Sequence, residues 1–202
     1  MALDGAFLRF IKTELEEKLI GLRVEKVFQP NRDELVVAFR GVSGAYKVLM
    51  SARANSPRVN ITQYPPENPQ TPPMLCMLLR KRLTGAKLKE ITQYQLERVI
   101  RFTFEATDEL GDKIELSLIA KIMGKYSNVI FVDGSGNVID ALKRVDMTMS
   151  SQRLSVLAVC KLYFLCVNLS RQSLGYIRKK SEQVLPLYSH SLCFITLKVK
   201  AV

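Results

Sequence analysis

Histidine is almost absent from the sequence, and cysteine is scarce over most of its length. The only histidine of the 202 residues is His190, and three of the four cysteines lie after residue 153. Residues 1–153 therefore contain no histidine and a single cysteine, Cys76. This excludes Ser-His-Asp and Cys-His catalytic machinery from that part of the chain, together with most zinc sites. We expect no metal, no cofactor and no disulfide there.

Long hydrophobic runs are absent as well. The longest run, from Leu154 to Val167, has 14 residues and contains Lys161. A membrane-spanning helix needs about 20 predominantly apolar residues. The first residues also lack the basic segment and the small-residue cleavage site of a secretory signal peptide. The sequence therefore predicts a cytoplasmic protein with no membrane partner.

Acidic residues are few, above all near the C-terminal end. Thirty Lys and Arg against 19 Asp and Glu give a net charge of +11, which permits binding to an anionic partner such as RNA, DNA or a membrane surface and does not distinguish them. Residues 154–202 contain seven basic residues and one acidic residue, so they supply +6, and residues 1–153 supply only +5. This break predicts a globular domain over 1–153 and a divergent basic tail over 154–202. We interpret the tail as a truncated or out-of-frame extension.

The patterns within residues 1–153 predict an α+β domain. A four-residue apolar repeat from Phe7 to Leu19 indicates an amphipathic helix over about 5–20, with Asp4 as its N-cap and Gly21 at its end. Alternating or compact apolar runs indicate short strands. These strands are expected at 23–28, 34–40, 46–51, 58–62, 97–104, 114–122, 128–132 and 137–142.

Three details refine this expectation. A second helix is predicted to open at Thr71-Pro72-Pro73, with Thr71 as its cap and Pro72 in its first turn, and to run through 74–83 to Gly85. The alternation over 114–122 predicts a half-buried strand. Residues 133–136 indicate a hairpin turn rather than a phosphate loop, because no helix with a Gly-Lys-Ser/Thr signature follows them. The fold class is thus α+β, with an antiparallel, β-sandwich-like sheet and flanking helices.

Some charged residues do not fit a purely structural role. Alternation places Arg98 on the same side as Phe102, and a buried guanidinium needs a partner. Either the strand begins after Arg98, or Arg98 lies at the rim of the sheet. Arg80, Lys81 and Arg82 end the second helix, where they complement the helix dipole or contact RNA.

The segment Met-Gly-Lys-Tyr-Ser-Asn at 123–128 has two interpretations. It is a turn, in which glycine adopts a positive φ and the serine and asparagine satisfy local backbone groups. Alternatively, it contacts single-stranded RNA. The lysine would then bind phosphate, the tyrosine would stack on a base, and the polar side chains would donate hydrogen bonds.

An ordered series of segments carries a resemblance to a known family. The segments are Gln29-Pro30, Glu34–Arg40, Ser56–Val59, Pro72–Lys81, Glu97-Arg98 and Met123–Asn128. Together they resemble the N-terminal domain of the NFACT family, over residues 1–153. The family includes the bacterial RqcH group, also labelled fibronectin-binding protein A, and the eukaryotic NEMF.

The resemblance implies a ribosome-associated quality-control factor. Such proteins bind a large ribosomal subunit that carries an obstructed peptidyl-tRNA, recruit tRNA (alanine tRNA is expected), and direct addition of alanine to the stalled chain. The tRNA-binding residues that the resemblance implies are Glu97, Arg98, Met123, Gly124, Lys125, Tyr126, Ser127 and Asn128. Glu97 stands where the family has aspartate. Further candidate RNA contacts are Arg58, Arg80, Lys81 and Arg82.

The family's N-terminal domain also resembles that of formamidopyrimidine-DNA glycosylases. Those enzymes use a proline after the initiator methionine as an amine nucleophile, whereas Ala2 stands here. We therefore expect no enzyme activity, since a shared fold does not imply a shared function. Two alternative functions remain: a surface adhesin with fibronectin as its partner, and a DNA-repair protein of the glycosylase type.

Overall fold

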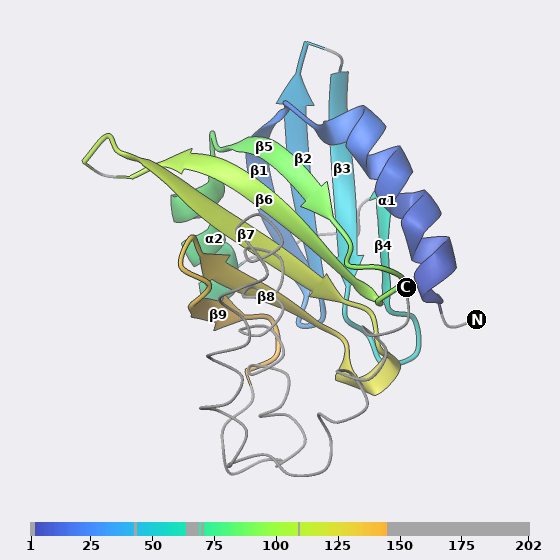
Figure 1. The fold of residues 1–202 in the computed structure, drawn as a ribbon. Helices are drawn as coiled ribbons and strands as arrows, with labels where there is room; N and C mark the ends of the chain where they lie inside the picture. Colours follow the sequence, from blue (N-terminus) through green and yellow to red (C-terminus); the bar gives the residue numbers. More distant parts are fainter. Residues whose placement is uncertain (1–2, 43, 64–68, 70, 109, 145–202) are drawn as a thin grey trace, which may run out of the picture. The chain divides into compact units, whose positions relative to one another are not determined.

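The computed structural model describes residues 3–42, 44–63, 69, 71–108 and 110–144. Within these residues, nine strands form one antiparallel sheet with two α-helices beside it (Figure 1). The strand order along the sheet is β4-β3-β2-β1-β5-β6-β7-β8-β9. The strands are β1 (Arg23–Asn31), β2 (Glu34–Gly41), β3 (Gly44–Ser51), β4 (Arg58–Thr62), β5 (Lys87–Thr92), β6 (Val99–Thr107), β7 (Lys113–Lys121), β8 (Asn128–Asp133) and β9 (Val138–Ala141). Every strand predicted from the sequence is present, with its ends within three residues of the predicted ones, but β5 was not predicted.

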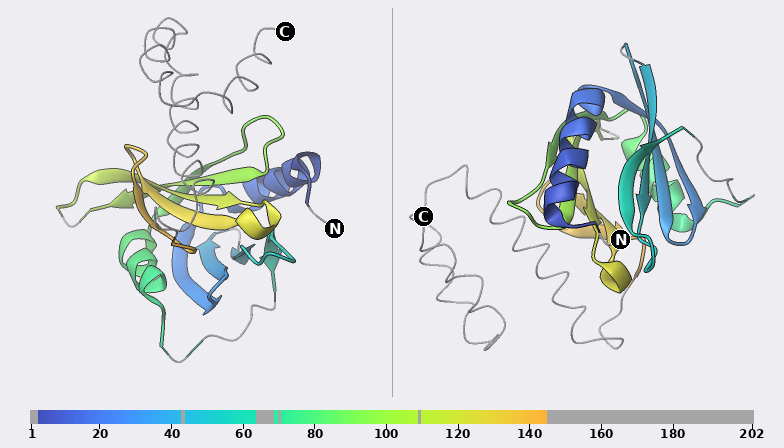
Figure 2. Two further views of the ribbon diagram at one scale, coloured as in Figure 1. Left: turned by 90° about the horizontal axis from the view of Figure 1, so that it is seen from below. Right: turned by 90° about the vertical axis from the view of Figure 1, so that its right-hand side faces the viewer.

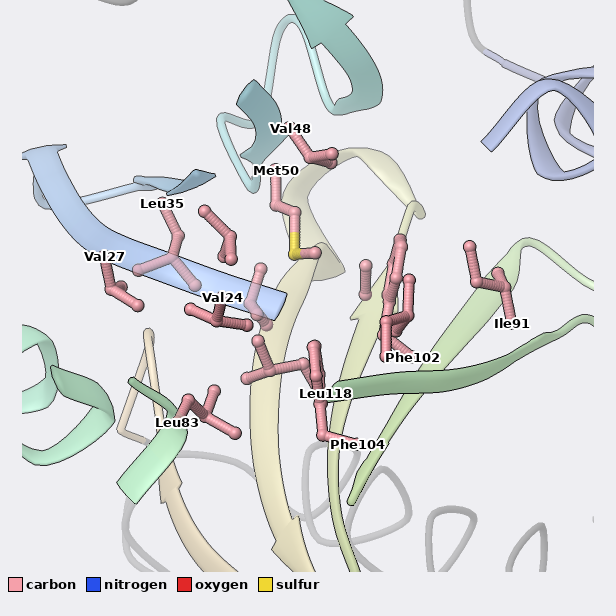
Figure 3. Close-up of a cluster of buried hydrophobic side chains, with 14 of the residues drawn as sticks. Val24, Val27, Leu35, Val48, Met50, Leu83, Ile91, Phe102, Phe104 and Leu118 are labelled. Atoms are coloured by element: carbon pink, nitrogen blue, oxygen red, sulfur yellow. The ribbon is translucent and has the colours of Figure 1, made fainter. Parts of the chain in front are cut away.

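The sheet folds back on itself at the junction of β1 and β5. These two strands share a single register pair, Arg23 with Lys87, so the halves on either side can turn toward each other. Phe39 of β2 stacks on Phe104 of β6, with 6.3 Å between ring centroids and 9° between ring planes. Side chains from both halves meet in one core (Figure 3). The α+β, sandwich-like arrangement that the sequence predicted is therefore confirmed.

Helix α1 (Gly5–Leu19) begins where the sequence predicted, and three of the four apolar residues of the predicted repeat, Ile11, Leu15 and Leu19, pack in or against the core. The Phe7 N–H donates to the Asp4 carboxylate at 2.7 Å, which caps the helix. Leu8 is buried, whereas Phe7 is 56% exposed. The prediction for Phe7 was wrong because an α-helix has about 3.6 residues per turn, so a strict four-residue repeat drifts around its axis.

Helix α2 (Met74–Leu83) begins later than its predicted cap. Its N-cap is Pro73, not Thr71, and no side chain caps it. A residue that precedes proline is driven to extended backbone, so Pro72, followed by Pro73, stays outside the helix. The two helices lie on different strands, α1 against β4 and β5 and α2 against β1 and β6 (Figure 2). Burial raises the pKa of the Cys76 thiol on α2.

Strand β7 is buried on both faces, not on one face as the alternation predicted. Leu118 points into the core, and Ser117 and Ile119 on the opposite face are buried as well. Ser117 tolerates burial because its Oγ accepts a hydrogen bond from Arg101 Nε at 3.0 Å. The neighbouring Arg101 is only 4% exposed. The sequence signal for this second buried face was Ile119, an apolar side chain between Ser117 and Lys121.

Two other predictions have different outcomes. The turn at 133–136 is confirmed, since it joins β8 and β9 and the Asn137 N–H donates to Asp133 Oδ1 at 2.8 Å. The boundary at residue 153 and the tail over 154–202 lie outside the described residues. No helix in the described ranges is long and apolar enough to cross a membrane.

The fully buried Phe104 should carry much of the stability of the shared core. We expect Phe104→Ala to lower the free energy of unfolding by about 3–5 kcal/mol, through lost burial and a residual cavity. Phe10→Ala is the matched control. Phe10 is 75% exposed, so its loss should change the free energy by less than about 0.5 kcal/mol. Urea unfolding followed by circular dichroism measures both, and equal effects would contradict the common core.

Candidate nucleic-acid interface

The candidate residues that precede β6 and those that follow β7 lie together at one end of the sheet, where these two strands begin and end. Strand β6 begins at Val99, directly after Arg98, and Val99 pairs with Lys121 at the end of β7. The Ile122 N–H donates to the Arg98 carbonyl at 2.8 Å. Lys121 in turn pairs with Asn128 at the start of β8. The interpretation that the strand begins after Arg98 is therefore confirmed, and Arg98 lies next to the 123–128 segment.

The Arg98 side chain is half-buried and retains its hydrogen-bonding capacity. Among the described residues, its guanidinium forms no hydrogen bond or ion pair, and it does not pair with the exposed Glu97. Arg101 is different, because it is buried and bonded to Ser117. A guanidinium that keeps its donors can bind a phosphate oxygen in two-point fashion.

The N-terminal end of α1 holds the loop that carries Glu97 and Arg98. The Gln93 side-chain amide donates to the Gly5 carbonyl at 2.9 Å and to the Glu97 carbonyl at 2.8 Å. The backbone of Leu96 approaches Gly5 so closely that a Cβ there would lie 1.6 Å from the Leu96 oxygen. Only glycine fits this contact. Helix α1 thus positions the loop, a role that sequence reasoning did not assign to it.

The turn predicted for the 123–128 segment is confirmed, and its contact with RNA stays a prediction. Ser127 Oγ accepts from the Met123 N–H at 2.8 Å, which closes the short helical turn η1 (Gly124–Tyr126). Asn128 is buried, and its Oδ1 accepts from the Lys143 N–H at 2.9 Å. These side chains shape the turn. The exposed Lys125 remains available, with its Nζ 5.0 Å from the centroid of the partly exposed Tyr126 ring.

Residue Arg58 lies at this same end of the sheet. A Cβ on Gly124 would be 4.0 Å from the Ala54 carbonyl oxygen, so η1 lies beside the loop from β3 to β4. Arg58 is the first residue of β4 and follows that loop. Figure 1 shows the η1 turn and this loop side by side, and Figure 2 shows the same proximity from another direction.

The basic residues at the end of α2 lie elsewhere. Arg80 Nε donates to the Val27 carbonyl at 2.7 Å, and Arg82 pairs with Asp108 at 3.3 Å. Asp108 follows the last residue of β6, a strand of nine residues, whereas Arg98 precedes the first. At about 3.3 Å per residue, these two ends are roughly 30 Å apart. Contact of Arg80, Lys81 and Arg82 with RNA stays a prediction, on a surface separate from Arg98.

Two basic residues at this end of the sheet, Arg53 and Lys143, were not predicted from the sequence because they belong to no motif. Arg53 pairs with Glu34, and Lys143 donates to the Ala52 carbonyl. The one sequence signal for a basic partner was Glu34 itself, an acidic residue at the start of the strongly apolar strand β2. No group of three or more His, Cys, Asp or Glu side chains within the described ranges could hold a metal ion.

These features define a class: an antiparallel α+β domain that presents basic and aromatic side chains from several loops at one end of its sheet. Residues 4–158 match the family of NFACT N-terminal and middle domains, and the chain belongs to that family. It is 39% identical over 154 residues to the Rqc2 homolog RqcH of Bacillus subtilis, an alignment that covers 76% of this chain and 27% of that protein.

Other relatives agree. The archaeal Rqc2 homolog aRqcH of Methanocaldococcus jannaschii is 32% identical over 131 residues, covering 63% of this chain and 18% of that one. The solved N-terminal domain of the fibronectin-binding protein PavA of Streptococcus pneumoniae matches with a TM-score of 0.71 and 37% identity, over 73% of this chain and 56% of that one. The corresponding part of a fibronectin/fibrinogen-binding protein from Streptococcus suis gives 0.69 and 40%, over 72% and 55%. The chain spans about a quarter of the length of its RqcH relative from Bacillus subtilis.

The contact between Gly5 and Leu96 predicts an unusual response to substitution. Alanine favours helix over glycine by about 1 kcal/mol, yet we expect Gly5→Ala to destabilise the protein by about 1–3 kcal/mol, because the new methyl group overpacks the loop. Thr13→Ala at an exposed position of the same helix is the control. Thermal unfolding measures both variants. A higher melting temperature for Gly5→Ala would refute the close approach of the Leu96 backbone.

Proposed function

We propose that the chain is a tRNA- and ribosome-binding module of a cytoplasmic ribosome-associated quality-control factor. Its partners are then the large ribosomal subunit with an obstructed peptidyl-tRNA and alanine tRNA, and it supports alanine addition to the stalled chain. One observation carries this proposal: Arg98 and Lys125 lie at one end of the sheet, and neither is neutralised by an acidic side chain among the described residues.

The chemistry of these groups suits RNA better than a small anion. The Arg98 guanidinium and the Lys125 ammonium provide cationic donors for backbone phosphates. The Tyr126 ring provides an apolar face on which an unpaired base can stack. The names of the bacterial and archaeal relatives, which are Rqc2 homologs, support the same function.

The role in this proposal is binding rather than catalysis. Residues 1–153 contain no histidine, because the single histidine of the chain is His190. Ala2 stands where the glycosylases have their proline nucleophile. The proposed module contributes to tailing by placing tRNA on the ribosomal subunit. The covalent chemistry of alanine addition is not assigned to its side chains.

Replacement of Arg98 should separate binding from folding. We expect Arg98→Ala to weaken binding of labelled alanine tRNA by about tenfold or more, because hydrogen bonds to charged groups contribute about 1.5–3 kcal/mol each. The unfolding midpoint should stay unchanged. Arg40→Ala is the matched control, since Arg40 pairs with Glu25 and is exposed. Fluorescence anisotropy at fixed salt measures the affinities, and unaltered tRNA binding by Arg98→Ala would disprove the role of this residue.

Fibronectin binding is the second candidate function, and the names of two relatives of known structure favour it. If the first proposal holds, the purified chain should show no saturable binding to immobilised fibronectin in surface plasmon resonance. Saturable binding that is equal for the wild type and for Arg98→Ala, together with protein on the surface of intact cells, would instead support an adhesin.

A further inference from the structure

We propose that Arg53 and Arg58, held by the buried carboxylate of Glu34, form a second phosphate-binding site for the RNA backbone beside Arg98 and Lys125. This site rests on the proposed function, since it requires that the chain bind RNA. It adds residues to which neither the sequence motif nor the relatives assign a joint role.

Glu34 is the centre of the site. It is the first residue of β2 and is only 1% exposed. Its Oε2 accepts from Asn31 Nδ2 at 2.7 Å and from Arg53 Nη2 at 3.1 Å. Its Oε1 lies 4.0 Å from Arg58 Nη2. A buried carboxylate is stable only when it is paired and hydrogen-bonded, so Glu34 holds Arg53 by a hydrogen bond and Arg58 by a longer ion pair.

The two arginines remain open to a ligand. Their side chains are 48% and 41% exposed, against 2% for that of Glu34. Two guanidinium groups share one carboxylate, so the trio keeps one net positive charge. Each guanidinium has five N–H donors, and Glu34 engages only part of them. A fixed, planar and partly exposed fork of donors matches the oxygens of a phosphate group.

The site adjoins the Lys125 surface. Arg53 precedes Ala54, whose carbonyl lies against Gly124 of η1. Lys143 strengthens this junction, because its Nζ donates to the Ala52 carbonyl and lies 3.7 Å from Asp33 Oδ1. An RNA strand that places one phosphate on Lys125 therefore passes close to Arg53. The adjacent Tyr126 ring favours RNA over an acidic peptide, since it offers a stacking surface for a base.

Salt-dependent binding tests the site directly. Each lost phosphate contact reduces the slope of log affinity against log salt by about 0.7–0.9. For Arg53→Gln and for Arg58→Gln in the 202-residue chain, we expect this reduction and about fivefold weaker binding of alanine tRNA at about 0.15 M salt. Arg40→Gln is the matched control, because Arg40 also pairs with a glutamate but lies at the opposite end of β2. It should leave both quantities unchanged.

Glu34→Gln tests positioning as opposed to charge. This variant makes the protein more positive, so general electrostatic attraction would strengthen RNA binding. We expect weaker binding, because the amide releases the two arginines from their fixed orientation. Equal or stronger binding by folded Glu34→Gln would overturn the positioning role. If this variant does not fold, Arg53→Lys provides the test: it keeps the charge but loses the fork, so wild-type affinity there would overturn the proposal.

The outcomes distinguish this site from the function on which it rests. A wild-type chain that does not bind tRNA, or binds it independently of Arg98, defeats the proposed function. If tRNA binding requires Arg98, but Arg53→Gln and Arg58→Gln have the wild-type tRNA affinity and the wild-type slope of log affinity against log salt, only this site is disproved. Polyglutamate binding that depends on Arg53 while RNA binding does not would replace RNA with an acidic protein partner and overturn the proposal.

Discussion

The fold-back of the sheet at the β1–β5 junction is the constraint on which the other features depend. It brings the inner faces of both halves into one core, where Phe39 stacks on Phe104. Because the halves face each other, the loop between β3 and β4 comes to lie beside η1, although more than sixty residues separate them in sequence. The same packing that stabilises the domain therefore assembles its basic end.

Intramolecular ion pairs, rather than the overall composition, determine where the domain carries uncompensated positive charge. Many of its cations are neutralised locally: Arg82 by Asp108, Arg40 by Glu25 and Lys113 by Glu105. Such exposed pairs contribute little stability, but they remove local positive charge. Arg98 and Lys125 keep their positive charge, because neither forms an ion pair with an acidic side chain of the described residues. A modest net charge of +5 over residues 1–153 is thus compatible with a concentrated anion-binding surface.

Sequence patterns predicted the elements well and the faces less well. Alternation, turn residues and the Asp4 cap identified the start of α1 and every strand of the described ranges except β5, because these signals act within a few residues. The burial of Phe7 on α1, the cap of α2 at Thr71 and the single buried face of β7 were predicted wrongly. Helical drift, consecutive prolines and the Arg101–Ser117 hydrogen bond decide these features. The Arg101–Ser117 hydrogen bond joins β6 to β7, and the apolar periodicity of a single strand contains no information about such a contact.

For the candidate site, the sequence by itself identified Arg98 and the 123–128 segment, and the family to which they belong. It did so because an arginine on an apolar face and an ordered series of motifs are readable along the chain. Only the tertiary structure decided that Ser127 and Asn128 shape the turn while Lys125 faces outward, and that α2's basic residues lie on another surface. It alone placed Arg53 and Arg58 around Glu34, because a buried carboxylate finds its partners in space, across strands, and not in sequence.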